Sequence, residues 1–90
     1  MAGVLNGPAR GRRVAVEGHA DSRERNDQQL SQVRAQTVAQ ALIAHGVNAS
    51  RIQTKGYGRR YPVALNVNPN GTDNPAGRAK NRRVEVVIEN

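Results

Sequence analysis

The chain has 90 residues, no cysteine, two aromatic side chains (Tyr57 and Tyr61) and a formal net charge of +7. This length allows one small domain, and the lack of cysteine excludes disulfides and thiolate metal sites. No apolar run approaches the roughly 20 residues of a membrane helix, while the excess of Lys and Arg raises the question of a polyanionic partner such as nucleic acid.

The first segment with a clear pattern is a short strand. Residues 1–11 contain Gly and Pro with little periodicity, so we interpret them as a leader or the remnant of a preceding helix, without a visible secretory signal. From Arg12 to Glu17 apolar and polar side chains alternate, which predicts a half-buried strand. Gly18 is expected to end it, and a polar loop follows.

A long helix is predicted over residues 27–45. Asn26 or Asp27 can serve as its N-cap, and Gly46 supplies a left-handed stop. The positions expected to face the sheet recur at three- and four-residue spacing, namely Leu30, Val33, Thr37, Val38, Ala41 and Leu42.

Two further strands complete the predicted sheet. They span residues 51–55 and 83–89, and Asn74-Pro75 is a typical start for a short helix through Asn81. A strand, a long helix and a strand predict a crossover between parallel strands, and the last strand joins the same sheet. The predicted class is α+β, a small mixed β-sheet with a long helix packed on one face.

One charged residue does not fit the helical pattern. On a helical wheel Arg34 lies about 40° from Leu30, inside the predicted apolar stripe. Because an unpaired buried charge costs several kcal/mol, Arg34 must extend to solvent, pair with an acid, or present its two-donor fork to a ligand carboxylate. The pattern alone leaves these alternatives open.

Asp21 is the natural counterpart of Arg34. It follows the first strand, at the sheet edge where open α/β-type sheets place ligand sites, and this edge lies beside the first turns of the helix. Asp21 and Arg34 are therefore expected at one mouth. A zwitterion with an ammonium and a carboxylate on the same carbon would satisfy both side chains, and a direct Asp21–Arg34 salt bridge is the alternative.

Several segments, in one order along the chain, resemble the OmpA-like C-terminal domain. They are Val14-Ala15-Val16-Glu17-Gly18-His19-Ala20-Asp21, Leu30-Ser31-Gln32-Val33-Arg34-Ala35, Gly56-Tyr57-Gly58, Pro62-Val63-Ala64-Leu65-Asn66 and Gly77-Arg78-Ala79-Lys80-Asn81-Arg82-Arg83-Val84-Glu85. The resemblance covers residues 12–90. It implies a non-catalytic domain that binds peptidoglycan through the diaminopimelate residue of the peptide stem.

The resemblance also implies the site. The acid of the Gly-His-x-Asp turn meets the diaminopimelate ammonium, and the arginine of Leu-Ser-x-x-Arg-Ala meets its carboxylate, which here are Asp21 and Arg34. Supporting contacts are expected from Asn26, Asp27, Leu30 and Arg83. The family implies no metal and no cofactor. It implies a periplasmic domain of an outer-membrane-associated protein, in contact with the membrane only through an anchor outside this sequence.

The chain also departs from the family pattern. The loop between Asp21 and Leu30 is shorter than usual, and Arg59 stands where the family has an acid. The family's first strand and most of its first helix are not seen before residue 12. We therefore expect an exposed sheet edge, which could recruit a second copy of the chain and form a homodimer.

An enzyme and a basic nucleic-acid-binding module are the alternative functions. His19 and Asp21 have no third ligand at metal-site spacing, and the chain offers few other acid–base groups. Arginine pairs such as Arg59-Arg60 could contact phosphates, but no stacking aromatics lie on the predicted strands, so no specific nucleic acid is expected. Phosphate binding should weaken steeply with salt, whereas binding of a zwitterion in a pocket should weaken less.

Overall fold

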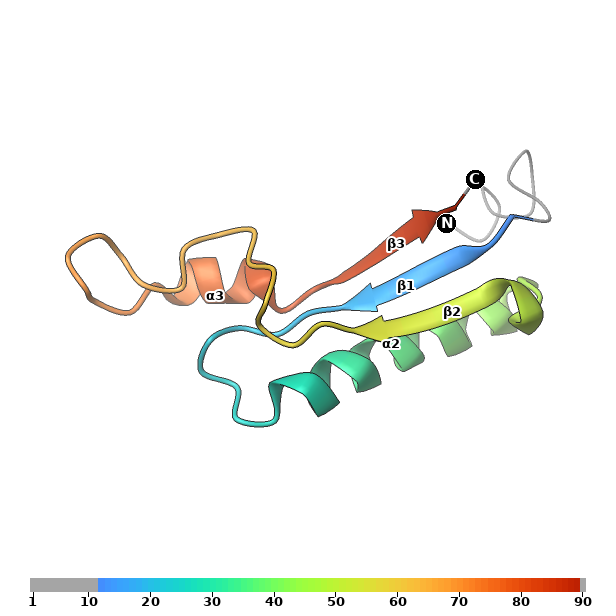
Figure 1. Ribbon diagram of the computed structural model, residues 1–90, viewed down its shortest axis with the longest axis horizontal. Helices are drawn as coiled ribbons and strands as arrows, with labels where there is room; N and C mark the ends of the chain where they lie inside the picture. The colour runs from blue at the N-terminus through green and yellow to red at the C-terminus, as the bar shows by residue number, and fades with distance from the viewer. Residues whose placement is uncertain (1–11, 90) are drawn as a thin grey trace.

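The structure is a computed structural model that describes residues 12–89, and the interpretation of residues 1–11 lies outside this range. A three-stranded sheet carries one long helix on one face (Figure 1). The elements are β1 (Val14–Gly18), α2 (Asp27–Ala44), the 3-10 turn η1 (Ala49–Arg51), β2 (Ile52–Gly56), α3 (Pro75–Asn81) and β3 (Val84–Ile88). The predicted α+β class is confirmed.

The strands lie in the order β2-β1-β3. β1 is parallel to β2 and antiparallel to β3, so that Val16 lies opposite Thr54 on one side and Val86 on the other. The predicted crossover between parallel strands and the addition of the last strand to the same sheet are confirmed. Gly18 is the last residue of β1, paired with Gly56, whereas the sequence pattern placed the end of the strand one residue earlier.

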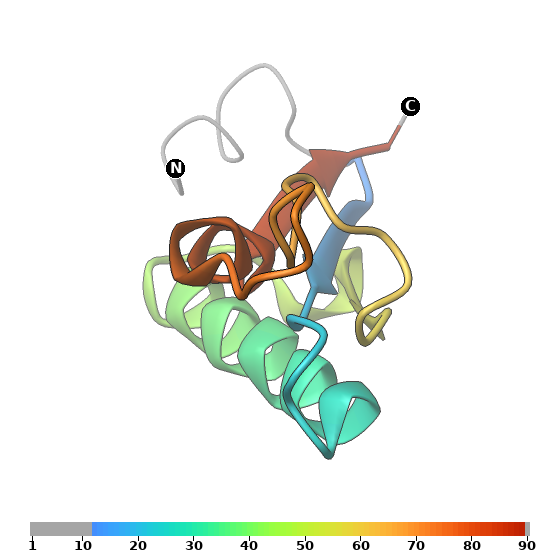
Figure 2. The ribbon, with the colours of Figure 1, turned by 90° about the vertical axis from the view of Figure 1, so that its left-hand side faces the viewer.

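The hydrophobic core lies between the sheet and α2. Among the described elements α2 packs mainly on β1 and β2 and touches β3 less, and Figure 2 shows it below one face of the sheet. Partly buried side chains of β2 and β3 pack against a buried cluster formed by Val14, Val16, Ala35, Ala39, Leu42 and Val47. Within residues 12–89, no helix has the length and apolar character needed to cross a membrane.

The face of α2 that is buried differs from the predicted one. Ser31, Ala35, Ala39 and Leu42 are buried, whereas Leu30 and Val33 are 37% and 49% exposed. Thr37 and Ala41 are exposed too, so the prediction that Leu30, Val33, Thr37 and Ala41 face the sheet is wrong. Small side chains occupy the contact because the helix approaches the strands closely, and the larger apolar residues are displaced to its flank.

Two strand-end glycines permit this close approach. A Cβ at Gly18 would overlap the carbonyl oxygen of Ser31, and a Cβ at Gly56 would lie 2.9 Å from the backbone nitrogen of Gln32. The buried Ser31 hydroxyl accepts a hydrogen bond from Gly58 N at 2.9 Å. The start of α2 is therefore fixed against the carboxyl ends of β1 and β2.

The ends of the helices follow the predictions with one exception. Gly46 has φ 102° and follows α2, and Asn74 Oδ1 accepts from Gly77 N at 3.1 Å at the start of α3. Asn26 is at the N-cap position of α2, but its side chain makes no capping hydrogen bond. The neighbouring Asp27 carboxylate accepts from Arg59 N at 3.1 Å and ties the helix start to the segment after β2.

We predict that Gly18→Ala strongly destabilises the fold, by about 1–3 kcal/mol or more, because the obstructing atom belongs to the helix backbone and cannot rotate away. Gly71→Asn is the matched control. Gly71 has φ 87° and nothing within 4 Å of an added Cβ, and asparagine tolerates the left-handed region better than most residues. Chemical denaturation of both variants measures the difference, and equal losses would contradict the close-packing argument.

The homodimer through a sheet edge stays a prediction. Within the described part of the chain, no strand pairs with the outer edge of β2 or of β3, and unpaired edges recruit other strands. We expect the sedimentation coefficient to rise with protein concentration, and Val87→Lys on β3 to reduce this rise, since a charged side chain blunts an edge strand. A monomer at all concentrations would contradict the prediction.

Candidate functional site

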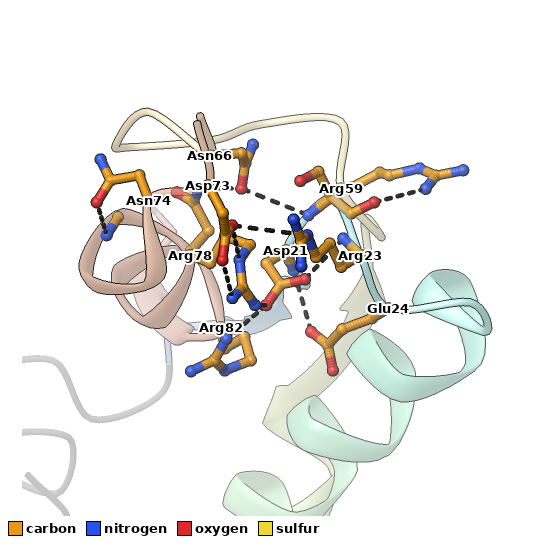
Figure 3. Close-up of polar contacts among 12 residues, drawn as sticks. Asp21, Arg23, Glu24, Arg59, Asn66, Asp73, Asn74, Arg78 and Arg82 are labelled. Carbon is orange, nitrogen blue, oxygen red and sulfur yellow. Dashed lines mark hydrogen bonds and ion pairs between the residues drawn. The ribbon is translucent and has the colours of Figure 1, made fainter. Parts of the chain in front are cut away.

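The candidate site lies where the carboxyl end of β1, the loop before α2 and the short helix α3 meet. Figure 3 shows the labelled side chains of Asp21, Glu24, Arg78 and Arg82 directed toward one another from these segments. Asp21 is 1% exposed, in the loop three residues after Gly18, the last residue of β1. A carboxylate at this depth must be paired, because an isolated buried charge is strongly unfavourable.

Two arginines of α3 supply the pairing of Asp21. The Oδ2 atom accepts from Arg82 Nη1 and, at 3.4 Å, from Arg78 Nη1. The Oδ1 atom accepts from the backbone nitrogen of Arg23 at 2.8 Å. Since residues four apart on a helix lie on the same side, Arg78 and the C-cap residue Arg82 reach the same carboxylate.

These contacts decide the ionisation of Asp21. Burial acts to raise the pKa of Asp21, but the hydrogen bonds from Arg82 and from Arg23 N, with the positive charges of Arg82 and Arg78, outweigh it and lower the pKa. Asp21 is therefore an ionised carboxylate at neutral pH despite its burial.

Arg34 is held by a different acid. Its Nη1 and Nη2 atoms each donate to one oxygen of Glu24, both at 2.7 Å, and Nη1 also donates to the backbone oxygen of His19 at 3.1 Å. The hydrogen bond from Arg34 is the largest influence on Glu24 and lowers its pKa, against the opposing effect of burial. This two-donor fork has the geometry expected of a strong carboxylate pair.

Glu24 connects the two predicted site residues. Its Oε1 atom accepts from Arg34 and also from the backbone nitrogen of Asp21 at 3.0 Å. A charge network is thus formed by Asp21, Glu24, Arg34 and Arg82. In it Glu24 pairs with Arg34, and Asp21 pairs with Arg82. The structure brings Asp21 and Arg34 into one region, where both contact Glu24. The direct Asp21–Arg34 salt bridge, the alternative considered from the sequence, is not among the ion pairs of the described residues.

A second acid fixes the position of α3. Asp73 receives two hydrogen bonds from Arg78, at 2.7 and 2.8 Å, and lies 3.6 Å from Arg23 Nε. The hydrogen bonding from Arg78 lowers the pKa of Asp73. Asn81 is buried at the other end of the helix. Its side-chain amide donates to the backbone oxygen of Ala64 and accepts from the backbone nitrogen of Ala64. Arg78 and Arg82 are therefore presented to Asp21 by an anchored helix.

The four expected supporting residues lie around this network without joining it. Asn26 is exposed, and Asp27 pairs with Arg59 at 3.9 Å. Leu30 is exposed on the flank of α2. Arg83 donates to Glu85 and to the backbone oxygen of Tyr61. Each of these contacts is to a group other than Asp21 or Arg34.

Sequence reasoning missed the roles of Glu24, Arg78 and Arg82. A signal for Glu24 was present, since Arg34 within a predicted apolar stripe needed an acidic partner and Glu24 lies in the adjacent loop. Arginines four residues apart on the predicted short helix were a signal for a shared partner. Neither signal identifies which acid pairs with which arginine.

The chemistry of this network is recognition of charge. It contains carboxylates with lowered pKa and arginines, and its guanidiniums offer forked donors to a carboxylate or phosphate. Within residues 12–89 no group of three or more His, Cys, Asp or Glu side chains is arranged to hold a metal ion. An incoming ligand can bind by replacing one charged partner with another of the same sign.

Comparison with known proteins identifies the relatives of this chain. The family model described as the OmpA family matches residues 1–82. The chain is 46% identical over 77 residues to the probable lipoprotein YiaD of Escherichia coli, covering 83% of this chain and 32% of YiaD. It is 42% identical over 78 residues to the peptidoglycan-binding protein ArfA of Mycobacterium tuberculosis, covering 84% of this chain and 22% of ArfA. The chain thus spans about a third or less of these relatives.

The structural comparison agrees with the sequence comparison. The crystal structure of the peptidoglycan-associated lipoprotein from Burkholderia pseudomallei superimposes with a TM-score of 0.82 at 29% identity, covering 98% of this chain and 70% of that one. The fold and the resemblance expected from the sequence are confirmed, as is the expectation of a non-catalytic module that comes with this family. The chain belongs to the OmpA family.

Proposed function

We propose that this domain binds peptidoglycan through the diaminopimelate residue of its peptide stem, with Asp21 receiving the ammonium and Arg34 the carboxylate. The observation that carries the proposal is the charge network, in which a buried ionised acid and a forked arginine are joined through Glu24. A zwitterion presents both complementary charges on one carbon. The family and the peptidoglycan-binding relative ArfA support peptidoglycan as the polymer that is bound.

The binding step is an exchange of ionic partners. The ligand carboxylate takes the place of the Glu24 carboxylate at Arg34, and the ligand ammonium shares Asp21 with, or displaces, the guanidinium of Arg82. Each exchange conserves charge at the site, so that no buried group is left unpaired. The energetic cost of binding is then the opening of two internal ion pairs, and Arg34 retains its contact to His19 O throughout.

We further propose that the protein carrying this domain is tethered to the cell wall on the periplasmic side of the outer membrane. The lipoprotein and porin relatives support this location. The domain needs no cofactor for such binding, because recognition rests on side-chain charges alone.

We predict that Asp21→Ala and Arg34→Ala each lower affinity for purified peptidoglycan roughly tenfold or more, since charge-assisted hydrogen bonds contribute about 1.5–3 kcal/mol each. Arg34→Lys should also bind weakly, because a point charge does not replace the two-donor fork. Co-sedimentation with sacculi, competed with free diaminopimelate, measures the effect.

Arg59→Ala is the matched control for the arginine variants. Arg59 is an exposed arginine paired with Asp27, outside the charge network, so its loss should leave sedimentation with sacculi unchanged. Circular dichroism establishes that every variant is folded. If folded Asp21→Ala and Arg34→Ala proteins sediment like the parent, the assigned site is wrong.

Binding should be constant between pH 7 and pH 5 and be lost as the pH falls below about 4. The pKa of Asp21 is lowered from its ordinary 3.8. The negative charge that receives the ligand ammonium is therefore fully present above that ordinary value and is lost as the pH falls through the lowered one. Sedimentation with sacculi across this range tests the prediction. A midpoint between pH 5 and 6.5 would instead indicate a histidine and contradict the carboxylate assignment.

A further inference from the structure

A second pocket lies on the opposite face of the sheet from α2. Side chains alternate along a strand, so β1 directs Val14 and Val16 to the core and Glu17 to the other face. A cavity of about 270 Å³ opens there, at the end of the sheet nearest the β1–α2 loop. It is lined by Glu17, His19, Tyr57, Tyr61, Arg83 and Glu85.

The aromatic side chains of the whole protein gather at this pocket. Tyr57 and Tyr61 are the only Phe, Trp or Tyr residues in the sequence. Their rings meet edge to face with centroids 5.2 Å apart, and the ring of His19 stacks on Tyr57 at 5.5 Å. The guanidinium of Arg60 already lies 5.8 Å from the Tyr57 ring centroid, which places a cation within the range of cation–π attraction.

Glu17 is the acid of this pocket without a cationic partner. The protein has 14 Lys and Arg against seven Asp and Glu. Six of the seven acids form ion pairs within residues 12–89, namely Asp21, Glu24, Asp27, Asp73, Glu85 and Glu89. Among the same residues, the hydroxyl of Tyr57 is the one partner of the Glu17 side chain, and it donates to Oε2 at 3.3 Å.

The charges next to Glu17 in the sheet make it less favourable for its carboxylate to have no cationic partner. In the sheet register Glu17 lies between Lys55 and Glu85, but the Lys55 ammonium lies 3.8 Å from Glu89. Glu85 is therefore a like charge directly opposite Glu17, an arrangement that destabilises a sheet. Arg83 pairs with Glu85 at 2.9 Å. The carboxylate of Glu17 is therefore left without an ion pair among the described residues.

His19 does not offset the negative charge of the pocket. Its side chain is 4% exposed, and neither ring nitrogen makes a hydrogen bond within the described residues, although Nε2 lies 3.1 Å from Glu85. Burial, followed by the charge of Arg83, lowers the pKa of His19, so the ring is neutral at pH 7. Two carboxylates and one guanidinium then line the pocket, a net charge of −1 in a protein of net charge +7.

We propose that this pocket binds a small primary aliphatic amine, with Glu17 as the counter-ion of the ammonium and the rings of Tyr57 and Tyr61 against the ammonium and the carbon chain next to it. The volume lies at the lower end for ligand pockets, which suits a small molecule. A carboxylate beside the ammonium would face both Glu17 and Glu85, so the pocket selects an amine without one. The charge network at Asp21 has the opposite preference, for a zwitterion.

The direct test is a titration of the 90-residue protein with 1,5-diaminopentane at pH 7, followed by NMR of the tyrosine rings and backbone amides. We expect saturable shifts at Tyr57, Tyr61 and Glu17. Pentane-1,5-diol, which has the same chain without charge, should give none. Equal shifts with the diol, or diamine shifts located at Asp21 and Glu24, would overturn the proposal.

Glu17→Gln isolates the counter-ion, because it keeps the size of the side chain and removes its charge. We expect about a tenfold weaker diamine affinity, as for the loss of one charge-assisted hydrogen bond. Asp27→Asn is the matched control, since Asp27 is an acid paired with Arg59 and does not line the pocket. Equal weakening by both variants would indicate general electrostatic attraction and overturn the assignment.

Two measurements separate this proposal from the peptidoglycan site. Glu17→Gln should sediment with sacculi like the parent, because Glu17 is not part of the charge network. Tyr61→Leu removes a ring that is 57% exposed, so the fold should survive while diamine affinity falls severalfold through loss of the cation–π contact. Unchanged diamine affinity in folded Tyr61→Leu would contradict the role of the aromatic wall.

Discussion

The burial of the Asp21 carboxylate is the constraint on which the rest of the site depends. A carboxylate that is 1% exposed stays charged only if cations reach it, and the two that do so come from the far end of the chain, 61 and 57 residues away. This requirement ties the β1–α2 loop to α3. It explains why a helix of only seven residues is anchored so firmly by Asp73, Asn74 and Asn81.

The close packing of α2 on the strand ends provides the second half of this arrangement. Gly18 and Gly56 bring the helix start against the sheet, and Ser31 bonds to the segment after β2. Arg34, one turn further along, thereby reaches both Glu24 in the loop and the carbonyl oxygen of His19. A larger residue at either strand end would separate the arginine from the loop that carries Asp21.

His19 lies between two chemically different surfaces. Its carbonyl oxygen accepts from Arg34 on the side of the charge network, while its imidazole lines the pocket on the other face. The first surface alternates acids with arginines, which suits a zwitterion. The second combines aromatic rings with an acid that has no cationic partner. The basic surface of the protein is therefore interrupted by one locally negative pocket, and net charge alone does not describe what each face attracts.

The helix wheel shows where local reasoning fails. Leu30 and Val33 were expected in the core because large apolar side chains usually are, yet Ser31, Ala35 and Ala39 occupy the interface. A hydrophobic pattern reports how favourably a side chain leaves water. It does not report the short distance between the α2 backbone and the strand backbones, which the strand-end glycines impose and which only small side chains fit. The wheel nevertheless identified Arg34 as a residue that needs a partner, because an arginine at the margin of the helix–sheet contact still requires one.

The sequence by itself determined the elements and the class, and it predicted that Asp21 and Arg34 lie close together. Alternation in β1 and β3, the spacing along α2 and the Asn74-Pro75 start are local patterns, and each fixes the backbone within a few residues. Only the tertiary structure decided which charges pair: Arg34 with Glu24, Asp21 with Arg78 and Arg82, and Glu17 with no cation of residues 12–89. The physical reason is that an ion pair depends on distances between segments remote in the chain, and no periodicity in the sequence encodes those distances.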